Sequence, residues 1–282
     1  MEVIEKAPAK INLGLDVIAK RPDDYHEIAT IMASIDLADY LTFSPRDDSQ
    51  IIIETENSFL PLDQNNHIYQ AVQCLQVAAK VNYGVTINLR KQIPVAAGLA
   101  GGSSDAAATL RGLNKLWHLD YTLNQLAEIG TQIGTDVPYC IYGQTTKATG
   151  IGTTLKHIAD FPRCWVVVVK PGVSISTAKI FAEVDVDGLT HPDIAALEMA
   201  IEQQDYFQIC HCMANSLEDI TVKYCPKIQA IKKCLHRQGA DAVVMTGSGP
   251  TILGFCHSQR KAAKIVNGLK GFCEEVYLVR TI

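Results

Sequence analysis

Residues 94–105 read Pro-Val-Ala-Ala-Gly-Leu-Ala-Gly-Gly-Ser-Ser-Asp, and this stretch decides how the rest of the chain is interpreted. It follows an alternating apolar run from Val85 to Ile93, which predicts a strand, and leads into a helical pattern that begins near Ser103. Glycine adopts backbone angles that other residues avoid and lets an anion approach the main chain. Unpaired N–H groups of a first helical turn attract such an anion. The stretch predicts a phosphate-binding loop, with a tight turn capped by Ser103 as the alternative.

Two familiar phosphate-binding motifs are absent from the sequence. Neither Gly-x-x-x-x-Gly-Lys-Ser/Thr nor Gly-x-Gly-x-x-Gly occurs. Since these motifs mark P-loop proteins and dinucleotide-binding folds, both classes are excluded.

Composition limits the partners that the chain can have. Its 282 residues carry 25 Lys and Arg against 30 Asp and Glu, a formal net charge of −5. Nucleic-acid surfaces need clustered positive charge, so such a partner is not expected. The first residues lack the apolar core of a signal peptide, and the run from Trp165 to Val169 is far short of the roughly 20 residues that span a bilayer. The nine cysteines lack paired spacing, which favours reduced thiols. We expect a soluble cytoplasmic protein, a monomer or weak homodimer, that binds a small molecule and neither nucleic acid nor membrane.

The order of predicted elements indicates an α+β protein with two domains. In the first half we expect strands at 4–15, 27–37, 40–44, 50–54 and 85–93, and helices at 71–79, 103–113 and 123–133. Thr122 and Gln125 provide a capping box for the last of these helices. In the second half we expect strands at 165–170, 242–245, 251–255 and 275–280, and helical stretches at 192–219, 227–238 and 258–269. That order is the split βαβ arrangement. The predicted domains are residues 1–157 and 158–282.

Three separated motifs together resemble the GHMP kinases, small-molecule kinases named after galactose, homoserine, mevalonate and phosphomevalonate. They are Pro8 to Leu15, the glycine-rich stretch and Thr246 to Thr251. The resemblance covers essentially the whole chain. It implies a first domain like domain 2 of ribosomal protein S5 and a second, ferredoxin-like domain, which agrees with the split βαβ order.

The resemblance also implies ATP as co-substrate and a small alcohol as phosphoryl acceptor. Mg²⁺ is implied by the reaction, and its ligands are unknown, with Ser104 as one candidate. The residues that would hold ATP by this resemblance are Pro94, Val95, Ala96, Ala97, Gly98, Leu99, Ala100, Gly101, Gly102, Ser103 and Ser104, together with Asn66 and His67 near the adenine. The segment 247–249 would support the loop or form only a glycine turn.

Asp136 and Lys10 are the catalytic residues that the resemblance implies. A carboxylate beside the acceptor hydroxyl can take its proton, and a nearby cation keeps that carboxylate ionised. From the residues alone, Asp136 before Val137 and Pro138 favours a helix N-cap over a base, and Lys10 a solvated surface lysine over a catalytic one.

Tyr25, His26 and Phe181 resemble residues that hold a cytosine ring. Flat aromatic faces stack on a base, and a histidine can bind its edge. Ordinary packing is the alternative for each of them. Asn12 shares a strand face with Lys10 and is expected to contact the substrate.

The chain departs from the family pattern at two places. Asp24 stands where glycine is usual, and Ile151-Gly152-Thr153 where Arg-Gly-Glu is usual. These changes could shift substrate preference. A sibling kinase for a mevalonate- or homoserine-like alcohol, and a non-catalytic nucleotide-binding relative, therefore stay as alternatives.

Overall fold

The structure is a computed structural model that describes residues 2–282. The chain forms two compact units, each assembled from several stretches of sequence. Unit 1 consists of the chain up to Lys10, Leu37–Val95 and Ala100–Gly143, and unit 2 of Ile11–Asp36, Ala96–Leu99 and Gln144–Ile282. The predicted boundary at residue 157, which assumed consecutive domains, stays a prediction.

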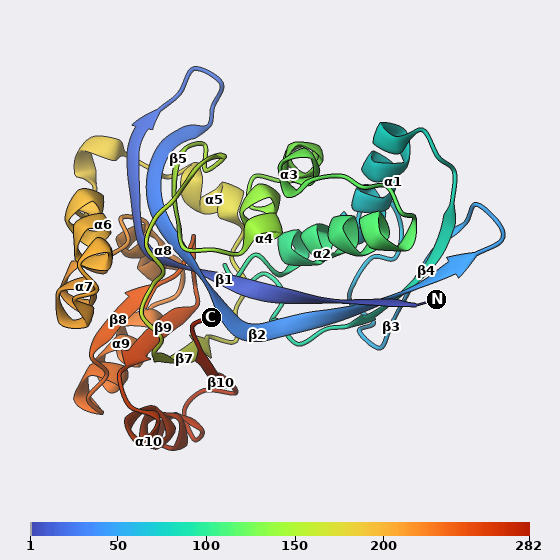
Figure 1. Cartoon of the computed structure of the whole chain (residues 1–282). Coiled ribbons are helices and arrows are strands. Elements are labelled where there is room, and N and C mark those ends of the chain that lie inside the picture. Colours follow the sequence, from blue (N-terminus) through green and yellow to red (C-terminus); the bar gives the residue numbers. More distant parts are fainter. Residues whose placement is uncertain (1) are drawn as a thin grey trace. The chain divides into compact units, whose positions relative to one another are not determined.

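Two long strands, β1 (Val3–Lys20) and β2 (His26–Arg46), pair with each other and contribute residues to both units (Figure 1). The sequence suggested two strands, 27–37 and 40–44, in place of β2, and this prediction was wrong. The strand continues because the buried carboxylate of Asp39 accepts hydrogen bonds from the backbone N–H groups of Gln92 and Ile93. A polar residue in the middle of the strand is thereby satisfied without interrupting it.

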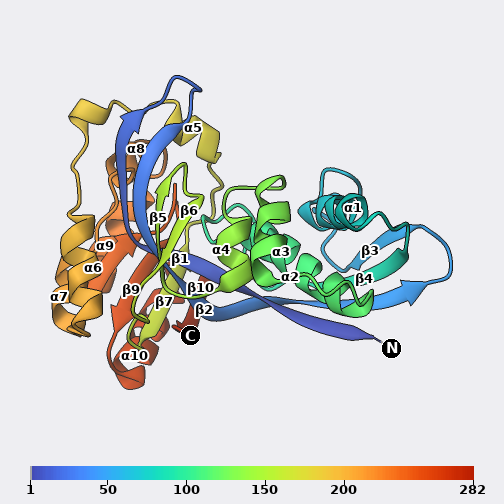
Figure 2. The same cartoon turned by 45° about the horizontal axis from the view of Figure 1, so that its top comes forward.

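In unit 1, β4 (Gly84–Arg90) pairs parallel with β3 (Ile51–Thr55) and antiparallel with the C-terminal part of β2. The helices of this unit lie on one side of these strands (Figure 2). They are α1 (His67–Ala79), α2 (Gly101–Leu116), α3 (Leu123–Thr131) and α4 (Val137–Tyr142). Gly112 lets α2 approach β2 closely, because a Cβ atom there would lie 2.4 Å from Cε2 of Phe43. Packing thus fixes α2 against the strands.

The predicted helix ends in unit 1 differ from the observed ones by a few residues. The capping box of Thr122 and Gln125 at the start of α3 is confirmed. α1 begins earlier than predicted, because the Asn66 side chain caps it by accepting from the N–H of Ile68. α2 begins at Gly101 with Ala100 at its N-cap position, so the prediction that Ser103 caps this helix was wrong.

Unit 2 contains a four-stranded antiparallel sheet with the order β10-β7-β9-β8. Its strands are β7 (Trp165–Lys170), β8 (Ala242–Met245), β9 (Ile252–Cys256) and β10 (Glu275–Arg280), and the helices α9 (Lys227–Arg237) and α10 (Gln259–Leu269) follow β7 and β9 in the chain. This order confirms the split βαβ arrangement. Buried apolar residues of the sheet and of both helices form one core, including Val167, Val169, Ile228, Ile231 and Ile265.

The predicted helical stretch 192–219 is broken into three helices, α6 (Ile194–Glu202), α7 (Tyr206–Cys212) and α8 (Glu218–Tyr224). The first break comes at Gln204, which has a φ of 57°. Asp205 then starts α7 by accepting hydrogen bonds from the N–H groups of Phe207 and Gln208. Because Asp205 accepts hydrogen bonds from the first N–H groups of α7, the chain gains by starting a new helix here instead of continuing α6.

The remaining elements of unit 2 are short. β5 (Thr146–Gly150) pairs with the first part of β2 and with β6 (Thr154–His157), a hairpin that the sequence did not predict. α5 (Thr177–Phe181) and a 3-10 turn (Val186–Gly188) follow β7.

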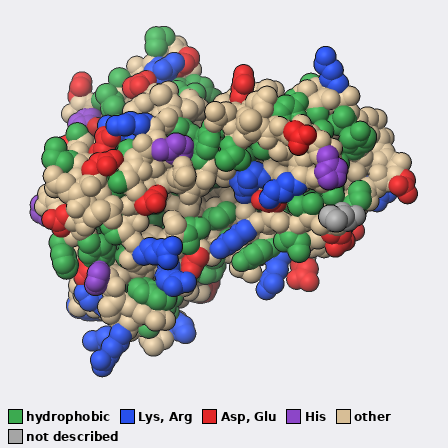
Figure 3. Space-filling view, in the orientation of Figure 1, with side chains coloured by type: hydrophobic (Ala, Val, Ile, Leu, Met, Phe, Trp, Pro, Cys, Tyr) green, Lys and Arg blue, Asp and Glu red, His purple; other side chains and the backbone are tan. Residues whose placement is uncertain are grey.

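The surface carries mixed charge. On the face shown in Figure 3, acidic and basic side chains are interspersed rather than gathered into one basic stripe. Within residues 2–282, every helix is too short or too polar to cross a bilayer.

Candidate active site

The glycine-rich loop alternates between ordinary and left-handed backbone angles. Ala96, Gly98 and Ala100 have φ values of 52°, 73° and 53°. Two of these are alanines, for which this conformation is unfavourable, and such strain often accompanies function. Alternation of this kind turns backbone N–H groups toward one concave surface, which binds anions. The loop conformation therefore favours an anion-binding role over a simple turn.

The first turn of α2, in unit 1, is flanked by nitrogen atoms of two side chains. A Cβ atom on Gly101 would lie 3.0 Å from Nζ of Lys91, and one on Gly102 would lie 3.1 Å from Nδ1 of His67. A side chain at either glycine would therefore press on its neighbour, which would have to move by a few tenths of an ångström. Nδ1 of His67 is buried and has no hydrogen-bond partner among residues 2–282.

In unit 2, the turn 246–249 packs against Gly98. A Cβ atom on Gly98 would lie 2.8 Å from the carbonyl oxygen of Thr246, and one on Gly247 would lie 3.1 Å from the carbonyl oxygen of Gly98. The predicted supporting role of segment 247–249 is confirmed at the level of packing.

Lys10 and Asp136 form an ion pair in unit 1, with Nζ and Oδ2 3.6 Å apart. The Lys10 side chain is 7% exposed, so it is not a solvated surface lysine. Asp136 precedes α4, and Pro138 lies in the first turn as predicted, but the carboxylate makes no capping hydrogen bond. Asp136 therefore occupies the N-cap position that the alternative predicted, but its side chain does not cap the helix. The carboxylate faces a cation and stays partly open, with 36% exposure.

Asn12 is buried in unit 2 and held by two threonines. Its Nδ2 donates to Oγ1 of Thr30 at 2.8 Å, and its backbone N–H donates to Oγ1 of Thr246 at 2.9 Å. The contact with substrate expected of Asn12 stays a prediction.

His26 and Phe181 come together in unit 2, with ring centroids 5.4 Å apart and tilted by 44°. Burial, followed by the charge of Lys20, lowers the pKa of His26, so its ring is neutral at pH 7. Nε2 of His26 is buried and has no hydrogen-bond partner within the described chain. The neighbouring Tyr25 is 57% exposed. The structure thus pairs two of the three predicted aromatic residues.

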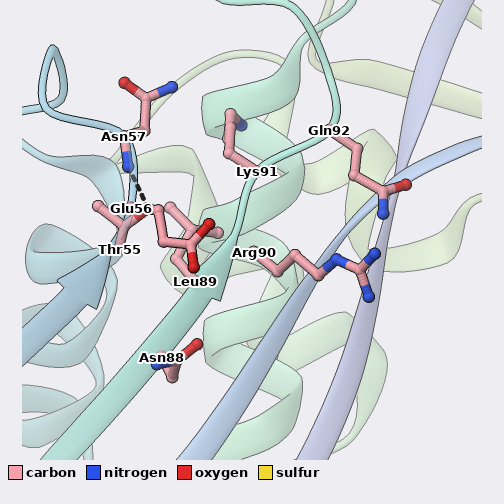
Figure 4. Close-up of a pocket in the computed structure, with 8 residues that line it drawn as sticks. All are labelled: Thr55, Glu56, Asn57, Asn88, Leu89, Arg90, Lys91 and Gln92. Carbon is pink, nitrogen blue, oxygen red and sulfur yellow. Dashed lines mark hydrogen bonds between the residues drawn. The ribbon is translucent and has the colours of Figure 1, made fainter.

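Sequence reasoning missed a pocket of about 750 Å³ in unit 1, where β3 and β4 end (Figure 4). Its lining residues are Thr55, Glu56, Asn57, Asn88, Leu89, Arg90, Lys91 and Gln92. Lys91 connects this pocket to the start of α2, because its ammonium group also lies beside Gly101. The only available signal was the cluster of polar residues after two predicted strands, which is common at strand ends.

Comparison with known proteins decides the family. The model for the N-terminal domain of GHMP kinases matches residues 66–144, and that for their C-terminal domain matches residues 196–275. The chain belongs to the GHMP kinases. The 4-diphosphocytidyl-2-C-methyl-D-erythritol kinase of Enterococcus faecalis is 54% identical over the full length of both proteins. The enzyme of the same name from Bacillus subtilis is 48% identical over all of this chain and 98% of the relative.

A crystal structure of 4-(cytidine 5'-diphospho)-2C-methyl-D-erythritol kinase has the same fold as this GHMP kinase. The TM-score is 0.84 at 30% identity, and the match covers 100% of this chain and 99% of the other. The predicted fold class is confirmed.

The two departures of this GHMP kinase from the usual pattern lie in turns of unit 2. Asp24 has a φ of 63°, a conformation in which glycine is unstrained and aspartate is tolerated. Ile151 and Thr153 flank Gly152 in the turn between β5 and β6, where a Cβ atom on Gly152 would lie 3.5 Å from Cδ1 of Ile28. The aspartate thus keeps the turn conformation that glycine would give.

Proposed function

We propose that this chain transfers the terminal phosphoryl group of ATP to the 2-hydroxyl of 4-diphosphocytidyl-2-C-methyl-D-erythritol, in isoprenoid precursor biosynthesis. This is the substrate after which the two full-length relatives are named. The observation that carries the chemistry is the pair of Lys10 and Asp136, a buried cation beside a carboxylate that is still open to a ligand.

In the proposed mechanism, Asp136 accepts the proton of the acceptor hydroxyl as the oxygen attacks phosphorus and ADP leaves. Lys10 pairs with Asp136 and stabilises negative charge on the attacking oxygen. Phosphoryl transfer requires little covalent chemistry from the protein, since positioning and electrostatics supply most of the rate. One carboxylate and one ammonium group are sufficient for these tasks.

The nucleotide site is proposed for unit 1. The triphosphate would bind at the start of α2, because a helix N-terminus attracts anions and Lys91 and His67 lie beside the glycines there. The adenine would occupy the pocket at the ends of β3 and β4, where Asn57, Asn88 and Gln92 offer donors and acceptors. The side chain of Asn66 already caps α1. We therefore assign Asn66 an indirect role, in which it fixes the start of α1 and so the position of His67.

Mg²⁺ would shield the phosphate charges of bound ATP. Among residues 2–282, there is no group of three or more His, Cys, Asp or Glu side chains placed to hold a metal ion. Ser104, the candidate ligand, is 1% exposed and its hydroxyl donates to the Pro8 carbonyl oxygen. Ser104 therefore does not fit, and the residues suit an ion that arrives on the triphosphate.

Cytosine recognition is proposed for unit 2. Phe181 and Tyr25 supply ring faces, and the neutral His26 offers Nε2 to the edge of the base. Base–aromatic stacking contributes about 1–3 kcal/mol per base, so each ring matters measurably.

A coupled assay of ADP release tests the proposal against its alternatives. We expect turnover with the cytidyl substrate and little with mevalonate or homoserine. Phe181→Ala should raise the KM for the cytidyl substrate about 10-fold, a change of about 1.4 kcal/mol that falls within the stacking range. Phe207→Ala, at a ring that is 72% exposed, is the control and should leave it unchanged. Turnover of another alcohol alone would identify a sibling kinase, and ATP binding without turnover a non-catalytic relative.

A further inference from the structure

Asp39, Lys91 and Asp105 form a buried charged cluster in unit 1 that the proposed mechanism does not use. Nζ of Lys91 lies 2.5 Å from Oδ2 of Asp39 and 2.6 Å from Oδ2 of Asp105. The three side chains are 0–7% exposed. They come from β2, from the residue after β4 and from α2, so the cluster joins three elements around the phosphate-binding turn.

The two carboxyl groups have different surroundings. Asp39 accepts hydrogen bonds from the backbone N–H groups of Gln92 and Ile93 in addition to one from the ammonium of Lys91, so both of its oxygens are satisfied. Oδ1 of Asp105 is buried and has no partner among residues 2–282. An ionised Asp105 would therefore leave an unsatisfied charged oxygen in the interior, which is costly.

Charge balance favours a proton on this cluster. With both carboxyl groups ionised, the cluster has a net charge of −1 in a site that excludes water, and with one proton it is neutral. Asp39 and Asp105 are both paired with the one ammonium group of Lys91, so a single proton on the cluster is enough to balance its charge. Burial, and the proximity of Asp39, raise the pKa of Asp105 to about 8 against the opposing effect of Lys91. Two other titratable groups lie near the cluster. Burial chiefly raises the pKa of the Cys140 thiol on α4, and the charge of Asp105 adds to this rise. His67 on α1 faces Gly102 at the start of α2.

We propose that Asp39, Lys91 and Asp105 form a neutral triad, with a proton on Asp105, that positions Lys91 beside Gly101. The triad holds the start of α2 against β4 and keeps a buried negative charge away from the phosphate site. Asp39 and Asp105 are thus positioning residues, since they act through Lys91. Loss of the proton would place a negative charge beside the bound triphosphate and weaken nucleotide binding.

Asparagine at position 105 imitates the protonated carboxyl and provides the first test. In the folded parent the proton stays bound up to about pH 8, whereas the unfolded chain releases it near pH 4. The parent should therefore lose stability relative to Asp105→Asn as pH rises from 5 to 8, seen as a growing difference in unfolding midpoints. A difference that is constant over this range would show that Asp105 is ionised and would overturn the triad.

The second test uses catalysis and so rests on the proposed function. The KM of the parent for ATP should rise several-fold between pH 7 and pH 9 with a smaller change in kcat, and in Asp105→Asn this rise should disappear. Asp105→Ala, which lacks the hydrogen bond to Lys91, should raise the KM at every pH. A rise in KM that persists in Asp105→Asn would contradict the triad. Absence of any ATP turnover would instead contradict the proposed function, and the unfolding test would still decide the triad.

Discussion

Asp136 is the side chain on which the proposed chemistry depends most directly. Asp136→Asn keeps the shape and removes the base, so kcat should fall about 100- to 10,000-fold, the range typical of general-base catalysis. The KM for ATP should change little, because the lost interaction forms mainly in the transition state. Steady-state kinetics with the cytidyl substrate measures both constants. Asp47→Asn, at an exposed position, is the charge-matched control and should behave as the parent.

Asp24 allows a second test at the scale of one residue. Its φ of 63° is accessible to glycine and to aspartate but costs other residues roughly 1–2 kcal/mol. Asp24→Gly should therefore leave the free energy of unfolding nearly unchanged, and Asp24→Ala should lower it by about 1 kcal/mol. Denaturant titration of the three proteins measures this. Equal stability of the Ala and Gly variants would contradict the strain argument.

Single residues also show what the sequence could predict. The motifs around Lys10, Asp136 and the glycines located candidate residues, but their alternatives could not be decided locally. Asp136 precedes a helix in either case, and only its distance to Lys10, which is far away in the chain, separates a base from a cap. Asp39, Lys91 and Asp105 were missed for the same reason, because each alone is an ordinary charged residue.

At the scale of elements, the glycine-rich loop is held by backbone contacts that a methyl group would break. Gly98→Ala should lower the free energy of unfolding by at least 1–2 kcal/mol, roughly the cost of its positive φ, because the new Cβ would also lie 2.8 Å from the Thr246 carbonyl oxygen. It should also raise the KM for ATP. Gly172→Ala is the matched control, since no atom of residues 2–282 lies within 4 Å of a Cβ there. Equal effects of the two substitutions would show that the close approach at Gly98 is unimportant.

Elements with strong local signals were predicted well, and those decided by distant partners were not. The capping box of α3 and the continuous apolar runs of β7 and β9 are local. The continuity of β2 depends on Gln92 and Ile93, which follow β4 in the chain. Their backbone N–H groups donate hydrogen bonds to the carboxylate of Asp39. The hairpin of β5 and β6 depends on pairing with β2. Periodicity does not encode such contacts.

The whole molecule is organised in a way that chain order does not suggest. β1 and β2 each supply residues to both compact units, which is a feature that the order of elements in the sequence does not reveal. A long strand can belong to both units because its two ends lie far apart, so that the side chains at each end pack in a different core. Membership of the GHMP kinases was nevertheless predictable, since its three motifs are each contiguous in sequence.

The proposed ligands divide between the units, and hydrogen exchange can test that division across the whole chain. A non-hydrolysable ATP analogue should slow amide exchange at residues 67–72 and 98–105, because its phosphates order the start of α2. Cytidine diphosphate should instead slow exchange at residues 25–28 and 177–181, where His26 and Phe181 meet. Uridine diphosphate is the matched control and should protect the latter segments less, because its base presents a different edge to His26. If cytidine diphosphate protected only residues 98–105, it would be binding through its phosphates alone, and the assignment of cytosine to His26 and Phe181 would be wrong.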